Sequence, residues 1–194
     1  LYGRSYIEDQ LLGKTYRISS KSFYQVNTEQ TEKLYQNAID FADLNEQDVV
    51  VDAYSGIGTI GLSLADRVKK VYGMEMIPEA IEDAQFNALT NKVENAHYEV
   101  GKAETVMKKW QDKGITPSVI VVDPPRKGLD GRFIESAIAM EPEKIVYISC
   151  NPATFARDAK LFADAGYQVE KIQPVDLFPQ TYHVELVALL TRKA

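Results

Sequence analysis

Short apolar runs rich in β-branched residues recur along the chain and are nearly uninterrupted by polar positions. They are Val49–Asp52, Val71–Glu75, Val119–Asp123 and Lys144–Ser149, with a weaker candidate at His97–Val100. Runs of this kind are typical of strands that are buried on both faces of a sheet.

Between these runs, apolar residues recur at helical spacing. Three such helices are predicted, each behind a capping residue or a proline suited to the first turn. Their apolar positions are Leu34, Ala38, Phe41 and Ala42 after Asn27 or Thr28; Ala80, Ile81, Ala84 and Ala88 after Pro78; and Phe155, Ala159, Phe162 and Ala163 after Asn151 and Pro152. The alternation predicts an α/β fold with a mainly parallel, doubly wound sheet.

The two ends of the chain depart from this alternation. Residues 1–26 carry two strand-like pieces around Gly13 and are interpreted as lead-in strands from a preceding region, so the main domain is predicted to cover 27–194. At the other end, Tyr167–Ile172 and Val184–Leu190 predict a hairpin-like pair of strands, so that the sheet ends in an antiparallel strand.

Composition limits the classes of protein that fit. The chain has 194 residues, 45% of them hydrophobic, which suits one globular domain. Its single Cys and two His cannot build a disulfide framework, a structural zinc site or an iron–sulfur cluster, and no apolar run approaches a membrane span. We therefore predict a cytoplasmic monomer without metal. The net charge of −6 argues weakly against this piece alone binding a phosphate backbone.

A glycine-rich loop follows the first predicted strand. Gly56, Gly58 and Gly61 form a G-x-G-x-x-G pattern, and Glu75 ends the next strand 19 positions after Gly56. Glycines let the backbone approach a ligand, and an acid at that strand end can accept hydrogen bonds from ribose hydroxyls. The pattern fits a dinucleotide, S-adenosylmethionine (SAM) or a structural turn. Asp52 favours SAM, because that ligand carries a cationic amino-acid tail.

A second motif, DPPRKGL, begins at Asp123. The rigid Pro124-Pro125 pair would fix the backbone at the carboxyl end of a strand, where open α/β sheets bind ligands. Arg126 follows closely and could meet an anionic substrate. The alternative interpretation is a turn that merely ends the strand.

The only cysteine, Cys150, lies between a predicted strand and a predicted helix. Asn151 is a good N-cap and Pro152 suits the first helical turn, so the thiol is expected at a helix N-terminus. That position should lower its pKa and favour the nucleophilic thiolate. A lone cysteine is also commonly a small buried core residue, and both interpretations stay open.

Glu185 begins the last apolar strand. Partial burial there would raise its pKa toward that of a general base, although a solvated charge at a strand end is the simpler alternative. His183 is expected on the same side, as a hydrogen-bonded neighbour rather than a catalytic group.

Together, KSFYQVN (21–27), DAYSGIGTIGL (52–62), DPPRKGL (123–129), SCNPATFARD (149–158) and FPQTYHVE (178–185) resemble the SAM-dependent RNA uracil-5-methyltransferases. The branch that modifies bacterial 23S rRNA is the most similar. The resemblance implies a Rossmann-like methyltransferase fold, SAM as the cofactor, and RNA, most simply 23S rRNA, as the partner. It also implies that an N-terminal RNA-binding domain similar to an OB-fold is absent here, and that any cysteines for an iron–sulfur cluster are absent with it.

The resemblance further implies the roles of individual residues. Cys150 would add to C6 of uracil, which activates C5 toward the methyl group, and Glu185 would then remove the C5 proton. SAM contacts are implied for Gln25, Tyr54, Glu75 and Asp123, beside the loop residues Asp52, Gly56 and Gly58. Because a stacked base is unreachable, the uridine must be flipped or single-stranded, with Asp123, Arg126 and Phe155 or Tyr182 as candidate contacts.

Three other classes compete. A nicotinamide-dependent oxidoreductase shares the glycine loop, but a cysteine–glutamate pair has no place in hydride transfer. An amino-group methyltransferase shares the Asp-Pro-Pro run but needs no thiol. A catalytically silent RNA-binding module of the same fold fits the acidic balance and the complete residue set least well. Within the uracil-5 class, tRNA stands as the alternative substrate to rRNA.

Overall fold

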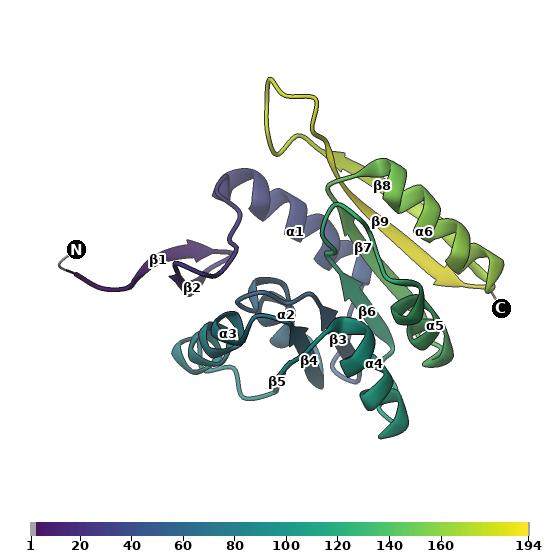
Figure 1. Cartoon of the computed structure of the whole chain (residues 1–194), viewed down its shortest axis with the longest axis horizontal. Helices are drawn as coiled ribbons and strands as arrows, with labels where there is room; N and C mark the ends of the chain where they lie inside the picture. Colours follow the sequence, from purple (N-terminus) through teal and green to yellow (C-terminus); the bar gives the residue numbers. More distant parts are fainter. Residues whose placement is uncertain (1–2, 194) are drawn as a thin grey trace.

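The computed structural model of the chain describes residues 3–193 and contains one central sheet with helices on both faces (Figure 1). The seven strands of this sheet run in the order β5-β4-β3-β6-β7-β9-β8. Their bounds are β3 Val49–Ala53, β4 Lys70–Glu75, β5 Ala96–Val100, β6 Val119–Val122, β7 Lys144–Ser149, β8 Tyr167–Val175 and β9 Glu185–Arg192. The predicted α/β fold and all five predicted internal strands are confirmed.

The inner strands are parallel, and helices cover both of their faces, as is typical of parallel sheets. β3 pairs in parallel with β4 and β6, and β6 pairs in parallel with β7. All four residues of β6 are buried, as are the last four of β3. Two layers of apolar side chains flank the sheet, and neither face is left open to solvent in this central part.

Six helices cover the sheet, with α1, α2 and α3 contributing to one apolar layer and α4, α5 and α6 to the other. Their bounds are α1 Thr28–Ala42, α2 Thr59–Ala65, α3 Pro78–Thr90, α4 Ala103–Asp112, α5 Gly131–Ala139 and α6 Pro152–Asp164. The three predicted helices are α1, α3 and α6. Asn27 caps α1 by accepting a hydrogen bond from the backbone N–H of Gln30, and Asn151 caps α6 through Ala153.

The C-terminal strands form the predicted antiparallel ending in an order that the sequence did not indicate. β9 is the last strand, yet it lies between β7 and β8 and runs antiparallel to both. β8 is therefore the edge strand, and seven of its nine residues are exposed. The consequence for function is that the start of β9 reaches the end of β7.

The two predicted N-terminal strands around Gly13 are an antiparallel hairpin, β1 Tyr6–Leu11 and β2 Lys14–Ser19. Side chains of α3 and of its C-cap residue hold β2 through its backbone. Asn91 bonds both backbone groups of Thr15, and Asn87 bonds both backbone groups of Arg17. The hairpin is thus attached to the main sheet's helical layer, while the proposed boundary at residue 26 stays a prediction.

Within residues 3–193, no helix is long and apolar enough to cross a membrane.

Candidate active site

The predicted site residues gather where the parallel strands end. The glycine loop follows β3, Glu75 ends β4, Asp123 follows β6 and Cys150 follows β7. Since these strands are parallel neighbours, their carboxyl ends meet at one edge of the sheet, which is the edge where open α/β folds bind ligands.

The glycine loop has a backbone that few residues adopt. Gly56 and Gly58 have φ values of 52° and 85°, and Tyr54 has a φ of 64° although it is not a glycine. A Cβ atom at Gly58 would lie 2.7 Å from the hydroxyl oxygen of Tyr98. Backbone strain of this kind clusters at ligand sites, and the loop here lines a pocket.

That pocket brings together residues from four parts of the sequence, one of which is Tyr35 on α1. Its lining includes Phe23, Tyr24 and Gln25 from the segment after β2, Tyr54 and Gly56 from the glycine loop, and Asp123 from the loop after β6. The structure therefore places Gln25, Tyr54, Gly56 and Asp123 around one space. Phe23 and Tyr24 were not named from the sequence, although both lie in the KSFYQVN motif beside Gln25.

Glu75 lies beside the glycine loop with its carboxylate fixed by backbone donors. One oxygen, Oε2, accepts a hydrogen bond from Gly56 N–H at 3.3 Å. The other, Oε1, accepts from Met76 at 2.7 Å and Ile77 at 3.1 Å. The carboxylate of Glu75 is thus held in place next to the loop by three backbone N–H groups.

Asp52 lies underneath the loop rather than in the pocket. Its side chain is fully buried, and its Oδ2 accepts a hydrogen bond from the backbone N–H of Gly61 at 2.8 Å. Burial raises the pKa of Asp52 to about 7, with the charge of Glu75 adding to the effect against the opposing Gly61 bond. This geometry favours a role in holding the loop over direct contact with a ligand.

Cys150 and Glu185 meet because of the β7–β9 register. Ser149 pairs with Leu186 in this antiparallel ladder, so the next position on β7's side, Cys150, lies across from Glu185. Glu185 is 4% exposed, whereas Cys150 is half-buried. Asp123 follows β6, which is the neighbour of β7 on the other side. The nucleophile candidate therefore lies between two carboxyl groups.

The pKa shifts in this cluster contradict the prediction made for Cys150. Burial raises the pKa of the Cys150 thiol, and the nearby Glu185 and Asp123 carboxylates raise it further, so the expected lowering by the helix N-terminus is wrong. Burial raises the pKa of Glu185, as predicted. Burial and the charge of Glu185 together raise the pKa of Asp123 to about 8. All three acids are thus shifted toward their protonated forms.

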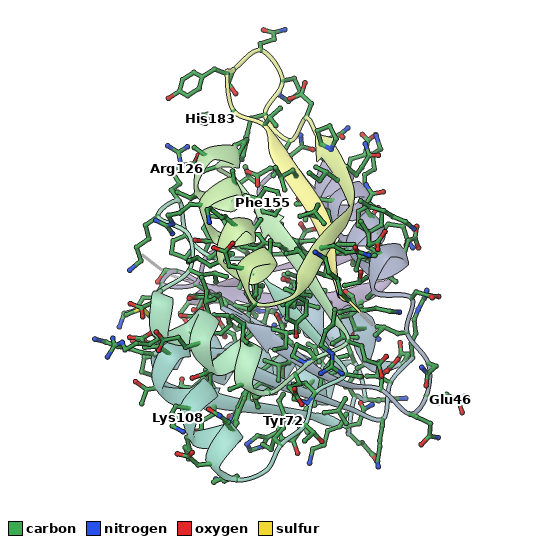
Figure 2. All side chains as sticks on the ribbon, turned by 90° about the vertical axis from the view of Figure 1, so that its right-hand side faces the viewer. Glu46, Tyr72, Lys108, Arg126, Phe155 and His183 are labelled. Carbon is green, nitrogen blue, oxygen red and sulfur yellow. The ribbon has the colours of Figure 1, made fainter. Side chains whose placement is uncertain are left out.

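Arg126 is the cation that faces this cluster. Its charge opposes the rise in pKa of both Cys150 and Glu185. Its Nη2 atom lies 3.3 Å from Nδ1 and 3.2 Å from Nε2 of His183, and the two side chains approach each other in Figure 2. His183 is therefore a neighbour in the site, in contact with Arg126.

The two aromatic candidates for packing on a base differ sharply in exposure. Phe155 is 5% exposed, and its ring packs edge-on against Tyr147 at 5.2 Å between centroids. It belongs to one of the two apolar layers of the core, so the structure argues against the predicted base contact. Tyr182 is 90% exposed and lies next to His183, with ring centroids 4.2 Å apart.

Comparison with known protein families agrees with this geometry. The sequence profile described as tRNA (uracil-5-)-methyltransferase matches residues 3–193. The chain belongs to this family. YljE, an uncharacterized RNA methyltransferase of Lactococcus lactis, is 63% identical over 193 residues, which are all of this chain and 42% of that protein. A Streptococcus agalactiae RNA methyltransferase is 61% identical over 99% of this chain and 43% of its own length. The chain spans less than half the length of these relatives.

Solved structures support both the family and the fold. The Pyrococcus abyssi tRNA (uracil-54, C5)-methyltransferase, in complex with S-adenosyl-L-homocysteine, superposes with a TM-score of 0.82 at 36% identity, over 98% of this chain and 45% of that one. The Methanocaldococcus jannaschii tRNA m1G37 methyltransferase gives 0.74 at 18% identity over 100% of this chain and 58% of that one, which shows the shared fold alone. The Rossmann-like methyltransferase fold expected of the family is thus confirmed.

Proposed function

We propose that this chain is the catalytic part of an enzyme that methylates C5 of a uridine in RNA with SAM. The observation that carries the proposal is the placement of Cys150 opposite Glu185 and beside Asp123. A half-buried thiol with a buried carboxyl group as its neighbour supplies both a nucleophile and a base. Family membership and the likeness to the 36% identical Pyrococcus uracil-C5 enzyme support the same reaction.

The glycine-loop pocket fits SAM by the chemistry of its lining. Tyr54 and Gln25 border the pocket, and Gly56 lets the backbone approach a ligand closely. The Glu75 carboxylate is bonded to Gly56 beside the pocket and retains acceptor capacity for ribose hydroxyls. Asp123 lies between this pocket and Cys150, where it can contact either the cofactor or the uracil. When bound, the cofactor supplies an electrophilic methyl group.

Cys150 would open the reaction. Its thiol proton leaves to solvent, and the thiolate sulfur then forms a bond to C6 of uracil while the C5–C6 electron pair moves onto O4 as an enolate. The enolate would make C5 nucleophilic toward the methyl group that the bound cofactor would supply. Burial and two carboxyl groups raise the pKa of Cys150, and the Arg126 charge acts in the opposite direction, toward the thiolate.

Glu185 would complete the reaction. Its carboxylate takes the proton from C5, the ring electrons return, and the C6–sulfur bond breaks to release Cys150 as the thiolate. The raised pKa of Glu185, caused by burial, makes it a stronger base than an ordinary carboxylate. The products are 5-methyluridine and S-adenosylhomocysteine, which balances atoms and charge with one proton released.

The RNA partner would present a flipped or unpaired uridine to Cys150. Arg126 and the exposed Tyr182 lie at this edge and are suited to contact a phosphate and a base face. We propose 23S rRNA as the substrate, on the strength of the sequence motifs. tRNA is the second candidate, which the tRNA enzyme of Pyrococcus abyssi favours. A cytoplasmic location and a monomeric state stay predictions.

The proposal is tested by incubating the full-length protein with labelled SAM and either 23S rRNA or a tRNA pool from cells that lack the gene. Digestion to nucleosides and mass spectrometry should show labelled 5-methyluridine from one of them. The Cys150→Ala variant should bind SAM and give none. Label appearing on another nucleoside, or undiminished in Cys150→Ala, would contradict the proposed reaction.

A further inference from the structure

The motif that contains the nucleophile extends eight residues beyond it, and the proposed reaction uses none of them. Four of these residues are polar, and their spacing places them on one side of the first two turns of α6. They are Asn151, Thr154, Arg157 and Asp158, which we call the α6 latch. All four contact the backbone of a single loop, residues 126–129, between β6 and α5.

The first half of the latch bonds one carbonyl group. Asn151 donates from Nδ2 to the carbonyl oxygen of Arg126 at 3.2 Å, and Thr154 donates from Oγ1 to the same oxygen at 3.3 Å. Asn151 directly follows Cys150 in the chain. The backbone of Arg126 is thus tied to the helix turn that begins next to the nucleophile.

The second half of the latch is partly buried. Arg157 donates from Nη2 to the carbonyl oxygens of Lys127 at 2.9 Å and Leu129 at 3.3 Å. Asp158 is fully buried, and its Oδ2 accepts from the backbone N–H of Leu129 at 2.7 Å. The other oxygen of Asp158 accepts from Arg157 at 2.8 to 2.9 Å, which orients the guanidinium toward the loop.

A second anchor and a glycine show how closely the loop fits against the latch. The Tyr147 hydroxyl on β7 donates to Oδ2 of Asp158 at 2.7 Å, so the latch is also fixed to the strand that leads to Cys150. Gly128 has a φ of 76°, and a Cβ there would lie 2.5 Å from Oδ2 of Asp158 and 2.6 Å from Nη2 of Arg157. A side chain at this position would push the loop away from α6.

We propose that the α6 latch positions the loop that carries Arg126 and follows Asp123 against the nucleophile, so that Arg157 and Asp158 are positioning residues for methyl transfer. The inference rests on the proposed function and adds the reason why these polar residues stand one and two turns beyond Cys150. Small displacements of reacting groups lower rates strongly, so the latch matters for the covalent step more than for cofactor binding. The glycine-loop pocket includes none of the four latch residues.

The test compares Arg157→Met with Lys160→Met in the full-length protein. The Arg157 side chain is 53% exposed, so its loss should leave the fold intact, and Lys160 on the same helix bonds Asp164 instead of the loop. Hydrogen exchange at the Leu129 amide, which donates to the Asp158 carboxylate that Arg157 pairs with, measures how firmly the loop is held and needs no activity. SAM affinity and the rate of covalent adduct formation on RNA containing 5-fluorouridine measure its effect on the site.

Arg157→Met should accelerate exchange at Leu129 and slow adduct formation about 10- to 100-fold, with SAM affinity unchanged. Arg157→Lys should recover part of the rate, and Lys160→Met should match the wild type. Unchanged exchange at Leu129 would overturn the latch. Faster exchange with a wild-type adduct rate would overturn its positioning role. A wild-type protein that forms no adduct would refute the proposed function instead, while the exchange result still decides whether the latch exists.

Discussion

The edge of the sheet where the parallel strands end has a glycine-loop half, after β3 and β4, and a nucleophile half, after β6 and β7. The two halves hold their acidic groups in different ways. On the glycine-loop side, backbone N–H groups fix the carboxylates, since Glu75 accepts three such bonds and Asp52 accepts one from Gly61. On the nucleophile side, burial raises the pKa of Cys150, Asp123 and Glu185, and neighbouring carboxylates raise the pKa of Cys150 and Asp123 further. Arg126 opposes the rise at Cys150 and Glu185. The proposed function assigns cofactor binding to the first half and the proton transfers to the second.

Replacing the proposed base should separate the two halves most strongly. Glu185→Gln removes the group that takes the C5 proton, so turnover should fall about 10²- to 10⁴-fold while SAM affinity stays the same. The methylated protein–RNA adduct should accumulate, because its release needs that proton transfer. Mass spectrometry of the adduct and calorimetry with SAM measure both effects. Glu170→Gln, an exposed acid on β8, is the control, and equal turnover in the two variants would exclude Glu185 as the base.

The buried Asp52 on the glycine-loop side should make the free energy of unfolding depend on pH. The pKa of Asp52 in the folded protein is raised to about 7. Its favourable contribution to the free energy of unfolding is therefore complete below the pKa that Asp52 has in the unfolded chain, and it is lost as the pH rises through 7. Asp52→Asn should therefore be more stable than the wild type at pH 8 by about 1–4 kcal/mol, with the difference vanishing near pH 4. Urea unfolding at both pH values measures this, and a pH-independent difference would contradict it.

Glu75 tests whether cofactor binding belongs to one half alone. Glu75→Gln keeps the side-chain shape but removes the charged acceptor beside Gly56, so SAM affinity should weaken about tenfold. The alkylation rate of Cys150 in the absence of SAM should not change. Calorimetry and mass spectrometry of the Cys150 peptide provide the two readings. A change in both would show that the two halves are coupled.

The smallest effect concerns the charge around the nucleophile. Removing the negative charge of Glu185 in Glu185→Gln should lower the pKa of Cys150, because that carboxylate helps to raise it. The pH profile of iodoacetamide alkylation at Cys150 should then shift to lower pH. In Arg126→Met it should shift to higher pH, and identical profiles in all three proteins would show that the charges do not act on the thiol.

Much of the fold could be predicted because its signals are local. The apolar runs of the inner strands and the caps at Asn27 and Asn151 are readable in short windows. α2, α4 and α5 were not predicted. α2 is only seven residues long and contains Gly61, but α4 buries Val106, Met107 and Trp110 at helical spacing, a signal that was present in the sequence.

The site was predicted less completely because its chemistry depends on contacts across the fold. A helix N-terminus alone would lower the pKa of Cys150, but burial, together with two acids from β9 and the loop after β6, raises it instead. Phe155 is one of the apolar positions whose spacing predicts α6, and the same spacing buries its side chain. Phe155 therefore could not be both a core residue and a contact for a base. The position of Glu185 opposite Cys150 depends on β9 entering between β7 and β8, which no local pattern indicates.

The central claim, that Cys150 attacks uracil with Glu185 as its base, is tested most directly with RNA that carries 5-fluorouridine. Fluorine cannot leave C5 as a proton, so the methylated adduct should be trapped on the full-length protein with SAM. Denaturing mass spectrometry should show the protein plus RNA plus one methyl group, located at Cys150 and lost in Cys150→Ala. Methyl transfer to uridine-containing RNA with no adduct on the fluorinated RNA, or an adduct that persists in Cys150→Ala, would contradict the account.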